Sequence, residues 1–210
     1  KNEKGKLWEI AYPLIDKVGE IVIATTRPET MFGDVAVAVN PNDERYKDLV
    51  GCKALLPIVK REIPIIADDY VDPAYGTGMV KITPAHDPND FEVGKRHNLE
   101  LVQVIDFDGK MINVPGQFAG MTALEARERV LAALEIDELL RGEKDIEHQV
   151  GHCYKCGSVI EPLAKEQWFV KMRQLADNAI AAIERKEVTF TPENKGDVVI
   201  KYLKDIKDWN

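Results

Sequence analysis

Seven short β-type runs, each closed by a turn, occupy the first half of this 210-residue chain and limit the folds open to it. They are Leu7–Ala11, Glu20–Thr25, Val35–Val39, Ala54–Val59, Ile63–Ile66, Met79–Thr83 and Leu101–Ile105. The stretches between the runs are too short for most crossover helices, and Pro57 and Pro64 interrupt two runs, so a doubly wound sheet is disfavoured. The pattern predicts an α+β fold with a curved β-barrel core and peripheral helices.

Helical patterns appear between and after these runs. Asn42–Leu49 can form about two turns after a strand that Pro41 ends. The clearest helix starts at Thr122, because Thr122 and Glu125 have capping-box spacing and an apolar helical period follows, with Gly142 as its stop.

The chain changes character after the charged stretch Gly142–His148, which we expect to be a solvated connector. Beyond it, Gln167–Val170 predicts a strand, and Arg173–Lys186 and Val198–Ile206 predict amphipathic helices. We therefore predict two domains, a barrel domain with its helices at residues 1–149 and a C-terminal strand and helix arm at residues 150–210.

Composition is that of an ordinary globular protein, with 45% hydrophobic and 30% charged residues. No run approaches the roughly 18 apolar residues of a membrane span, and no signal peptide is visible. We expect a cytoplasmic protein without a membrane partner. The net charge of −8 disfavours a surface that coats nucleic acid but leaves room for a local basic groove.

The three cysteines disfavour a disulfide framework, because the number is odd in a chain of cytosolic composition. Cys153 and Cys156 form a C-x-x-C pair, the spacing of half a zinc site. His148 or His152 could add ligands, the missing ligands could lie outside this sequence, or the pair could bind no metal. We expect an empty or absent zinc site.

The stretch Gly76–His97, GTGMVKITPAHDPNDFEVGKRH, predicts a capped helix start. Asp87 suits the N-cap, Pro88 the first helical position, and Asp90 the third, where a carboxylate meets the helix dipole. Capping alone would explain both carboxylates.

The strand that precedes this helix adds polar groups of opposite charge. Lys81 and Thr83 alternate onto one face of it, and Gly78 permits close approach of the backbone. If this face converges with the helix start, the two form a small polar pocket able to bind an ammonium group and a hydroxyl.

A second polar group lies upstream in ATTRPET, which contains Thr25, Thr26, Arg27, Glu29 and Thr30. The proline of this motif would hold hydroxyls, guanidinium and backbone amides in a turn. A structural ion pair between Arg27 and Glu29 would explain the motif equally well.

Three motifs, ATTRPET, YGTGMVKITPAHDPNDFEVGKRHNL and IEPLAKEQWFVKM, together resemble the editing domain inserted into class I aminoacyl-tRNA synthetases for branched aliphatic amino acids. The resemblance covers nearly the whole chain and is strongest to the valyl form. The HIGH-like and KMSKS-like signatures of the synthetic site are absent from the sequence. The resemblance thus implies an inserted domain that itself uses no cofactor, ATP being used only by the whole enzyme.

The resemblance implies hydrolysis of threonyl-tRNA(Val), with hydrolysis of threonyl-adenylate left open. A hydrophobic site for valine cannot strongly reject an isostere that adds a hydroxyl, a limit known from valyl enzymes themselves, so a second site must demand that hydroxyl. The implied partners are the acceptor end of tRNA(Val) and the catalytic core of the parent synthetase. Alternatives are an acceptor-end binding module that is inactive by itself and a leucyl- or isoleucyl-type editing domain.

Residue roles follow from the resemblance. Asp90 would anchor the substrate α-ammonium, and Lys81 and Asp87 would recognise the threonine hydroxyl. Thr83, Thr25 and Thr30 would line the pocket or hold the attacking water, and Arg27 would contact the terminal adenosine or a phosphate oxygen. The remaining substrate-binding candidates are Thr26, Gly78 and His86. No covalent intermediate is expected, and we disfavour His86 as the general base.

Overall fold

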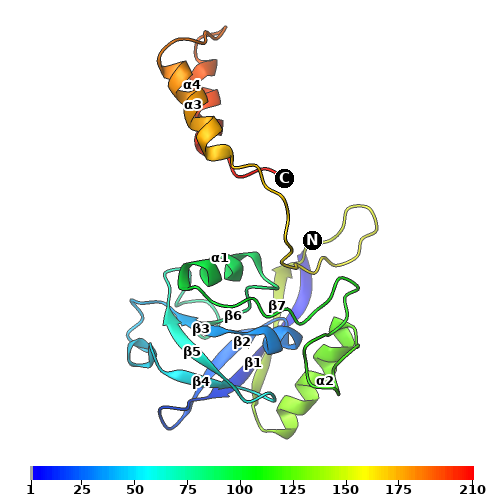
Figure 1. Cartoon of the computed structure of the whole chain (residues 1–210). Helices are drawn as coiled ribbons and strands as arrows, with labels where there is room; N and C mark the ends of the chain where they lie inside the picture. The colour runs from blue at the N-terminus through cyan, green and yellow to red at the C-terminus, as the bar shows by residue number, and fades with distance from the viewer. Residues whose placement is uncertain (1) are drawn as a thin grey trace. The chain divides into compact units, whose positions relative to one another are not determined.

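The computed structural model describes residues 2–210. Along the chain lie β1 (Asn2–Pro13), β2 (Glu20–Thr25), the 3₁₀ helix η1 (Pro28–Gly33), β3 (Ala36–Val39), the 3₁₀ helix η2 (Lys47–Leu49), β4 (Lys53–Leu56), β5 (Arg61–Ala67), β6 (Met79–Ile82), α1 (Pro88–His97), α2 (Ala123–Ile136), β7 (Leu140–Gln149), α3 (Met172–Glu184) and α4 (Lys195–Lys204) (Figure 1). The chain falls into two compact units, one ending at Ala164 and one formed by Lys165–Asn210. The predicted domain boundary between residues 149 and 150 stays a prediction.

Two sheets form the first unit. One has the order β2-β1-β7, with antiparallel neighbours, and the other has the order β4-β5-β3-β6, in which only β3 and β5 are parallel. The α+β class is confirmed, but the strands of residues 2–210 do not close into the predicted barrel. The sheets are joined by the single bridge between Leu14 and Ala54, and β2 lies beside β6 without a hydrogen-bonded ladder.

The stretch Gly142–His148, predicted as a solvated connector, lies inside the ten-residue strand β7. It pairs with β1 along its length, from Asn2 opposite Gln149 to Ile10 opposite Leu140. Its side chains alternate only between half-buried and exposed, so the strand lacks the apolar alternation that marks a buried strand in a sequence.

Three further segments differ from the prediction. Leu101–Ile105 forms only the bridge between Ile105 and Met111, and Asn42–Leu49 forms turns and η2 in place of two helical turns. In the second unit, Gln167–Val170 is not a strand, because only Val170 pairs, with Trp209. These short apolar runs fit several backbone states equally well.

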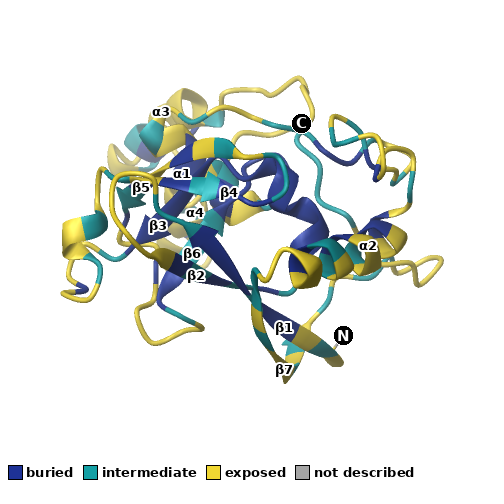
Figure 2. Ribbon diagram, turned by 90° about the horizontal axis from the view of Figure 1, so that it is seen from below, coloured by how far each residue is buried: buried dark blue, intermediate teal, exposed yellow. Residues whose placement is uncertain are grey.

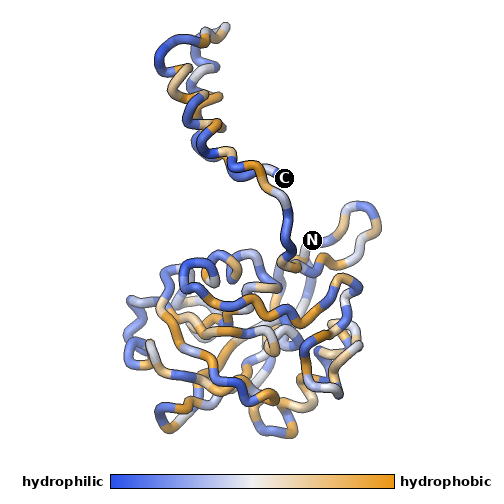
Figure 3. Tube along the Cα trace, in the orientation of Figure 1, coloured by the Kyte–Doolittle hydropathy of each residue, from blue (hydrophilic) through white to orange (hydrophobic). Residues whose placement is uncertain are grey.

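The core of the first unit lies between the inner faces of the sheets and α2. Buried stretches of the strands are dark blue in Figure 2, and hydrophobic stretches of the trace are orange in Figure 3. Tyr12, Ile23 and Phe118 are almost fully buried there. α2 adds Val130 and Leu134, both 0% exposed, and each such side chain contributes about 1.5–3 kcal/mol of burial free energy. This packing fixes α2 against η1, which follows the end of β2.

The second unit is a pair of packed helices. α3 buries Ala176 and Ile180, whereas Leu175, which the amphipathic pattern places on the apolar face, is 55% exposed. Trp168 is 95% exposed and Trp209 is 69% exposed. No helix within residues 2–210 combines the length and the apolar character needed to cross a membrane.

Candidate active site

A pocket of about 230 Å³ lies where the end of β2 and η1 meet β6 and the start of α1. Every predicted site residue except Gly78 lines it. The full lining is Leu7, Ala24, Thr25, Thr26, Arg27, Thr30, Tyr70, Tyr75, Val80, Lys81, Thr83, His86, Asp87 and Asp90. The two polar motifs, remote in the sequence, therefore form one site.

The start of α1 places two carboxylates in this pocket. Asp87 is the N-cap, and its Oδ1 accepts hydrogen bonds from the amides of Asn89 (2.7 Å) and Asp90 (3.1 Å). Asp90 accepts the Thr83 amide on Oδ2 at 2.8 Å, which ties α1 to the end of β6. Neither Asp87 Oδ2 nor Asp90 Oδ1 accepts a hydrogen bond within residues 2–210, so each carboxylate keeps one oxygen for a ligand.

The environment of Asp90 favours its neutral form. Burial raises its pKa from 3.8 to about 7, and the charges of Asp87 and Asp34 add to the increase, against the opposing effects of Lys81 and the Thr83 amide. A cation bound at Asp90 would stabilise the carboxylate and release its proton.

Lys81 is held by the protein itself. Its Nζ donates to Asp34 Oδ1 at 2.8 Å, Thr30 Oγ1 at 3.0 Å and Thr83 Oγ1 at 2.5 Å. An ammonium group has three protons, so all three are used. Lys81 therefore orients the two threonine hydroxyls in this state, and a ligand hydroxyl could bind to it only by displacing one of them.

Asp34 organises this network and was missed by the sequence analysis. Its side chain is fully buried and also accepts hydrogen bonds from Thr83 Oγ1 (2.6 Å) and the Tyr12 hydroxyl (2.7 Å). Burial, followed by the charge and hydrogen bond of Asp34, raises the pKa of Tyr12 well above 10. The sequence signal is weak, because an aspartate directly after a glycine is typical of an exposed turn.

Arg27 lies at the side of the pocket between several acceptors. Its Nη1 donates to the His86 carbonyl at 3.1 Å, and its Nη2 forms an ion pair with Glu161. Glu29 Oε1 lies 3.6 Å from its Nε. The expected ion pair with Glu29 is present, but it is the longest of these contacts, because Glu29 is bound by Arg127 at 2.8 and 2.9 Å.

The ring of His86 is buried and hydrogen-bonded to the backbone. It is 1% exposed, and its Nε2 accepts the Val104 amide at 2.8 Å, which places the proton on Nδ1. Burial, with the charges of Arg27 and Lys81, lowers its pKa to about 4. His86 contributes its carbonyl, which binds Arg27.

Gly78 lies outside the pocket. Its φ is +79°, and a Cβ there would collide with Arg45 and with the Pro73 carbonyl, so glycine is needed for the turn itself. The wall residues that the sequence analysis missed include Tyr70 and Tyr75, which are 43% and 62% exposed. Nothing in their spacing distinguishes them from ordinary loop tyrosines.

The C-x-x-C pair forms a tight turn. The Cys153 amide donates to the Ser158 carbonyl and the Gly157 amide to the Cys153 carbonyl, both at 2.8 Å. Hydrogen bonding with Ser158 lowers the pKa of Cys156 to about 7. His152 is engaged with Glu3 and Gly157. Within residues 2–210 no third His, Cys, Asp or Glu joins the two thiols, which supply half of a tetrahedral zinc set.

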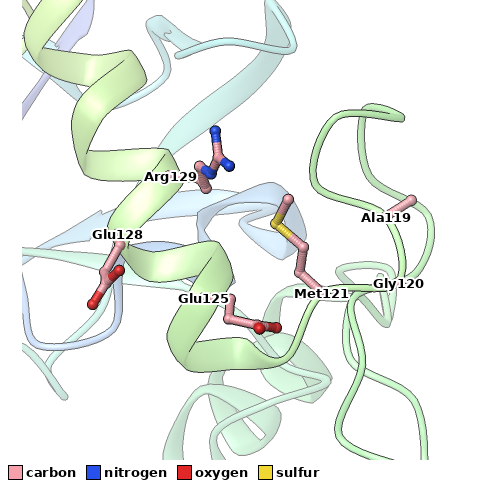
Figure 4. Close-up of a pocket in the computed structure, with 6 residues that line it drawn as sticks. All are labelled: Ala119, Gly120, Met121, Glu125, Glu128 and Arg129. Atoms are coloured by element: carbon pink, nitrogen blue, oxygen red, sulfur yellow. The ribbon is translucent and has the colours of Figure 1, made fainter.

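A larger hollow, about 460 Å³, lies over the first turns of α2 and offers no comparable chemistry. Figure 4 shows that Arg129, Glu128 and Glu125 point in different directions around it. The Glu125 carboxylate is used in the predicted capping box with Thr122. The smaller pocket is therefore the candidate site.

Comparison with known proteins agrees with this geometry. A family model described as the editing domain of leucyl-tRNA synthetase matches residues 49–135. The valine–tRNA ligase of Petrotoga mobilis is 53% identical over 208 residues, which are 99% of this chain and 24% of that protein. The enzyme of Symbiobacterium thermophilum is 53% identical over 209 residues, 100% of this chain and 23% of that protein.

A solved structure shares the fold. It is the ternary complex of Agrobacterium radiobacter K84 agnB2 LeuRS with tRNA and LeuAMS, with a TM-score of 0.52 and 18% identity, covering 76% of this chain and 24% of that one. Over the residues that the family model matches, the chain is thus similar to an editing domain of the class I aminoacyl-tRNA synthetases. Over nearly its whole length it is similar to a segment of valine–tRNA ligases, and it spans about 24% of the length of the curated relatives that it matches.

Proposed function

We propose that this domain hydrolyses the ester of threonyl-tRNA(Val). A water oxygen attacks the ester carbonyl, the bond from that carbon to the ribose oxygen breaks, and the proton lost by the water passes to the leaving ribose oxygen. The products are threonine and tRNA with a free 3′ end. The observation that supports this most is the pair of unsatisfied oxygens, on Asp87 and Asp90, beside the saturated Lys81 network.

The free oxygens fit the two polar groups of a threonyl ester. The α-ammonium would bind Asp90 Oδ1, and the threonine hydroxyl would donate to Asp87 Oδ2. A valyl group has no hydroxyl to donate, so it would displace water from the Asp87 oxygen without replacing the hydrogen bond. The free energy of binding would be less favourable by about 1–3 kcal/mol. Lys81, whose protons are all used, would act by holding Thr30 and Thr83 in place. In this proposal Lys81 does not contact the threonine hydroxyl itself, which differs from the role that the resemblance implies for it.

The pocket volume fits the aminoacyl group rather than a nucleotide. About 230 Å³ is below the range of about 300–1,000 Å³ that is usual for sites that enclose a larger ligand. The terminal adenosine would lie outside, against the exposed rings of Tyr70 and Tyr75, with Arg27 beside it.

Water would be positioned by hydroxyls, since the ring of His86 is not available. Thr25 Oγ1 accepts the Arg27 amide at 3.1 Å, so its own proton can be donated to water. The neighbouring hydroxyl of the tRNA terminal ribose would complete the water site. Hydrolysis of threonyl-adenylate before transfer would use the same ammonium and hydroxyl contacts. The same proposal includes a cytoplasmic location. Its partners are the acceptor end of tRNA(Val) and the catalytic core of the synthetase.

Deacylation tests the proposal directly. Threonyl-tRNA(Val) and valyl-tRNA(Val) are incubated with the chain and with Asp90→Asn, and Glu92→Gln serves as the matched control because Glu92 lies on α1 and is exposed. We expect selective loss of the threonyl ester, a decrease of about 10- to 100-fold in Asp90→Asn, and no change in the control. Equal slow loss of both esters would refute the specificity.

A leucyl-type editing activity is the second candidate, because the matching family model is that of the leucyl enzyme. A panel of mischarged tRNAs separates the two activities. Binding of the acceptor end without turnover would instead favour a binding module that needs the whole enzyme for hydrolysis.

A further inference from the structure

We infer that Arg127 on α2 is a positioning residue for the site, because it determines, through Glu29, which partners Arg27 takes. This inference rests on the proposed function, in which Arg27 contacts the tRNA end. Arg127 is not a pocket residue, since it is absent from the lining that includes Arg27.

The carboxylate between the two arginines is the centre of this arrangement. Glu29 is 0% exposed and lies in η1, two residues after Arg27. Arg127 binds it with two parallel hydrogen bonds, Nε to Oε2 at 2.8 Å and Nη2 to Oε1 at 2.9 Å. The Arg127 guanidinium also lies 5.9 Å from the centre of the Trp8 ring, which fixes it from a second side. A bidentate pair of this kind occupies one acceptor site on each carboxylate oxygen and partly compensates the buried charge.

Arg27 is consequently left to other partners. Its Nε is 3.6 Å from Glu29, beyond a normal hydrogen bond, while its Nη atoms bind the His86 carbonyl and Glu161. These contacts keep its guanidinium at the pocket wall, where it can meet a ligand. The position of Arg27 thus depends on the ion pair that Glu29 forms with Arg127 of α2.

Removing the Arg127 charge would change the hydrogen-bond partners of Arg27. Among residues 2–210, Arg27 and Arg127 are the two cations within ion-pair distance of Glu29. A buried carboxylate without a partner is strongly unfavourable, so Arg27, already 3.6 Å away, would move onto Glu29. The His86 carbonyl and the ligand would then lose the guanidinium.

Kinetics of threonyl-tRNA(Val) deacylation test this coupling with Arg127→Met and the matched control Arg129→Met, two residues further along α2 and exposed. Because Arg27 would contact a part of the substrate that does not react, its displacement should increase KM by about 10- to 100-fold and leave kcat unchanged. A merely structural role would reduce the active fraction, and therefore kcat, without changing KM. Arg129→Met should match the wild type.

Two further variants keep the test decisive. In an Arg27→Gln background, Arg127→Met should cause no additional increase in KM. The double variant Glu29→Gln with Arg127→Met buries no unpaired charge, so it should fold and return KM toward the wild-type value. An unchanged KM in Arg127→Met, or additive effects with Arg27→Gln, would overturn the inference. Failure of the wild-type chain to hydrolyse threonyl-tRNA(Val) would instead refute the proposed function.

Discussion

Replacing Asp90 with asparagine should change how the stability of this domain depends on pH. The substitution keeps an acceptor for the Thr83 amide, which Asp90 Oδ2 binds at 2.8 Å, and removes the ionisable group. In the folded chain, burial raises the pKa of Asp90 from 3.8 to about 7. The folded state therefore holds the proton more tightly than the unfolded chain does.

The sign and the size follow from this difference. The stabilising effect of the proton is complete below pH 3.8 and is lost as the pH rises through 7, so ionisation of Asp90 destabilises the wild type in neutral solution. The full shift corresponds to about 4 kcal/mol, of which about 3 kcal/mol falls between pH 5 and pH 8. The Asp90→Asn variant has no carboxyl group to ionise at this position, so it does not lose this stability as the pH rises. Its stability relative to the wild type should therefore increase by about 3 kcal/mol across that interval.

Urea unfolding followed by circular dichroism at pH 5, 6, 7 and 8 measures the effect. Glu92→Gln is the control, because this α1 carboxylate is exposed and its profile should parallel that of the wild type. A constant difference between Asp90→Asn and the wild type would show that Asp90 is fully ionised at pH 5. The burial-based account of the site would then be wrong.

Two other substitutions test the surroundings of the pocket. Asp34→Asn leaves the Lys81 ammonium, 11% exposed, without its charge partner and should lower the free energy of unfolding by about 3 kcal/mol. Glu62→Gln, in the exposed pair with Lys53, should have a much smaller effect, and equal effects of the two substitutions in urea unfolding would contradict a buried network. Glu161→Gln releases Arg27 from a carboxylate that is 29% exposed, so adenosine monophosphate should bind up to about fivefold more tightly by calorimetry, and weaker binding would refute competition between Glu161 and a phosphate.

Local chemistry made part of the site predictable. The N-cap Asp87, the first-position Pro88 and the capping box of Thr122 act over three residues, so their effect on the backbone can be inferred without the rest of the fold. The strand containing Lys81 and the turn at Arg27 were found in the same way, from short motifs.

Contacts between distant residues made the remainder unpredictable. Asp34 is buried because Tyr12 and Lys81, 22 and 47 residues away, supply its donors, and neither separation leaves a mark in the sequence. β7 is a strand because β1 is beside it, whereas its own charged sequence suggests a connector. The barrel was expected from strand spacing, but closure depends on the β2 and β6 edges, which lie side by side without a ladder.

The central claim is that the free oxygens of Asp87 and Asp90 bind the hydroxyl and the ammonium of a threonyl group. A crystal structure with a non-hydrolysable threonyl-adenosine analogue tests it most directly. The account predicts the ammonium within hydrogen-bond distance of Asp90 Oδ1, the threonine hydroxyl on Asp87 Oδ2, and Lys81 still bound to Asp34. A threonyl group bound away from both carboxylates would contradict it.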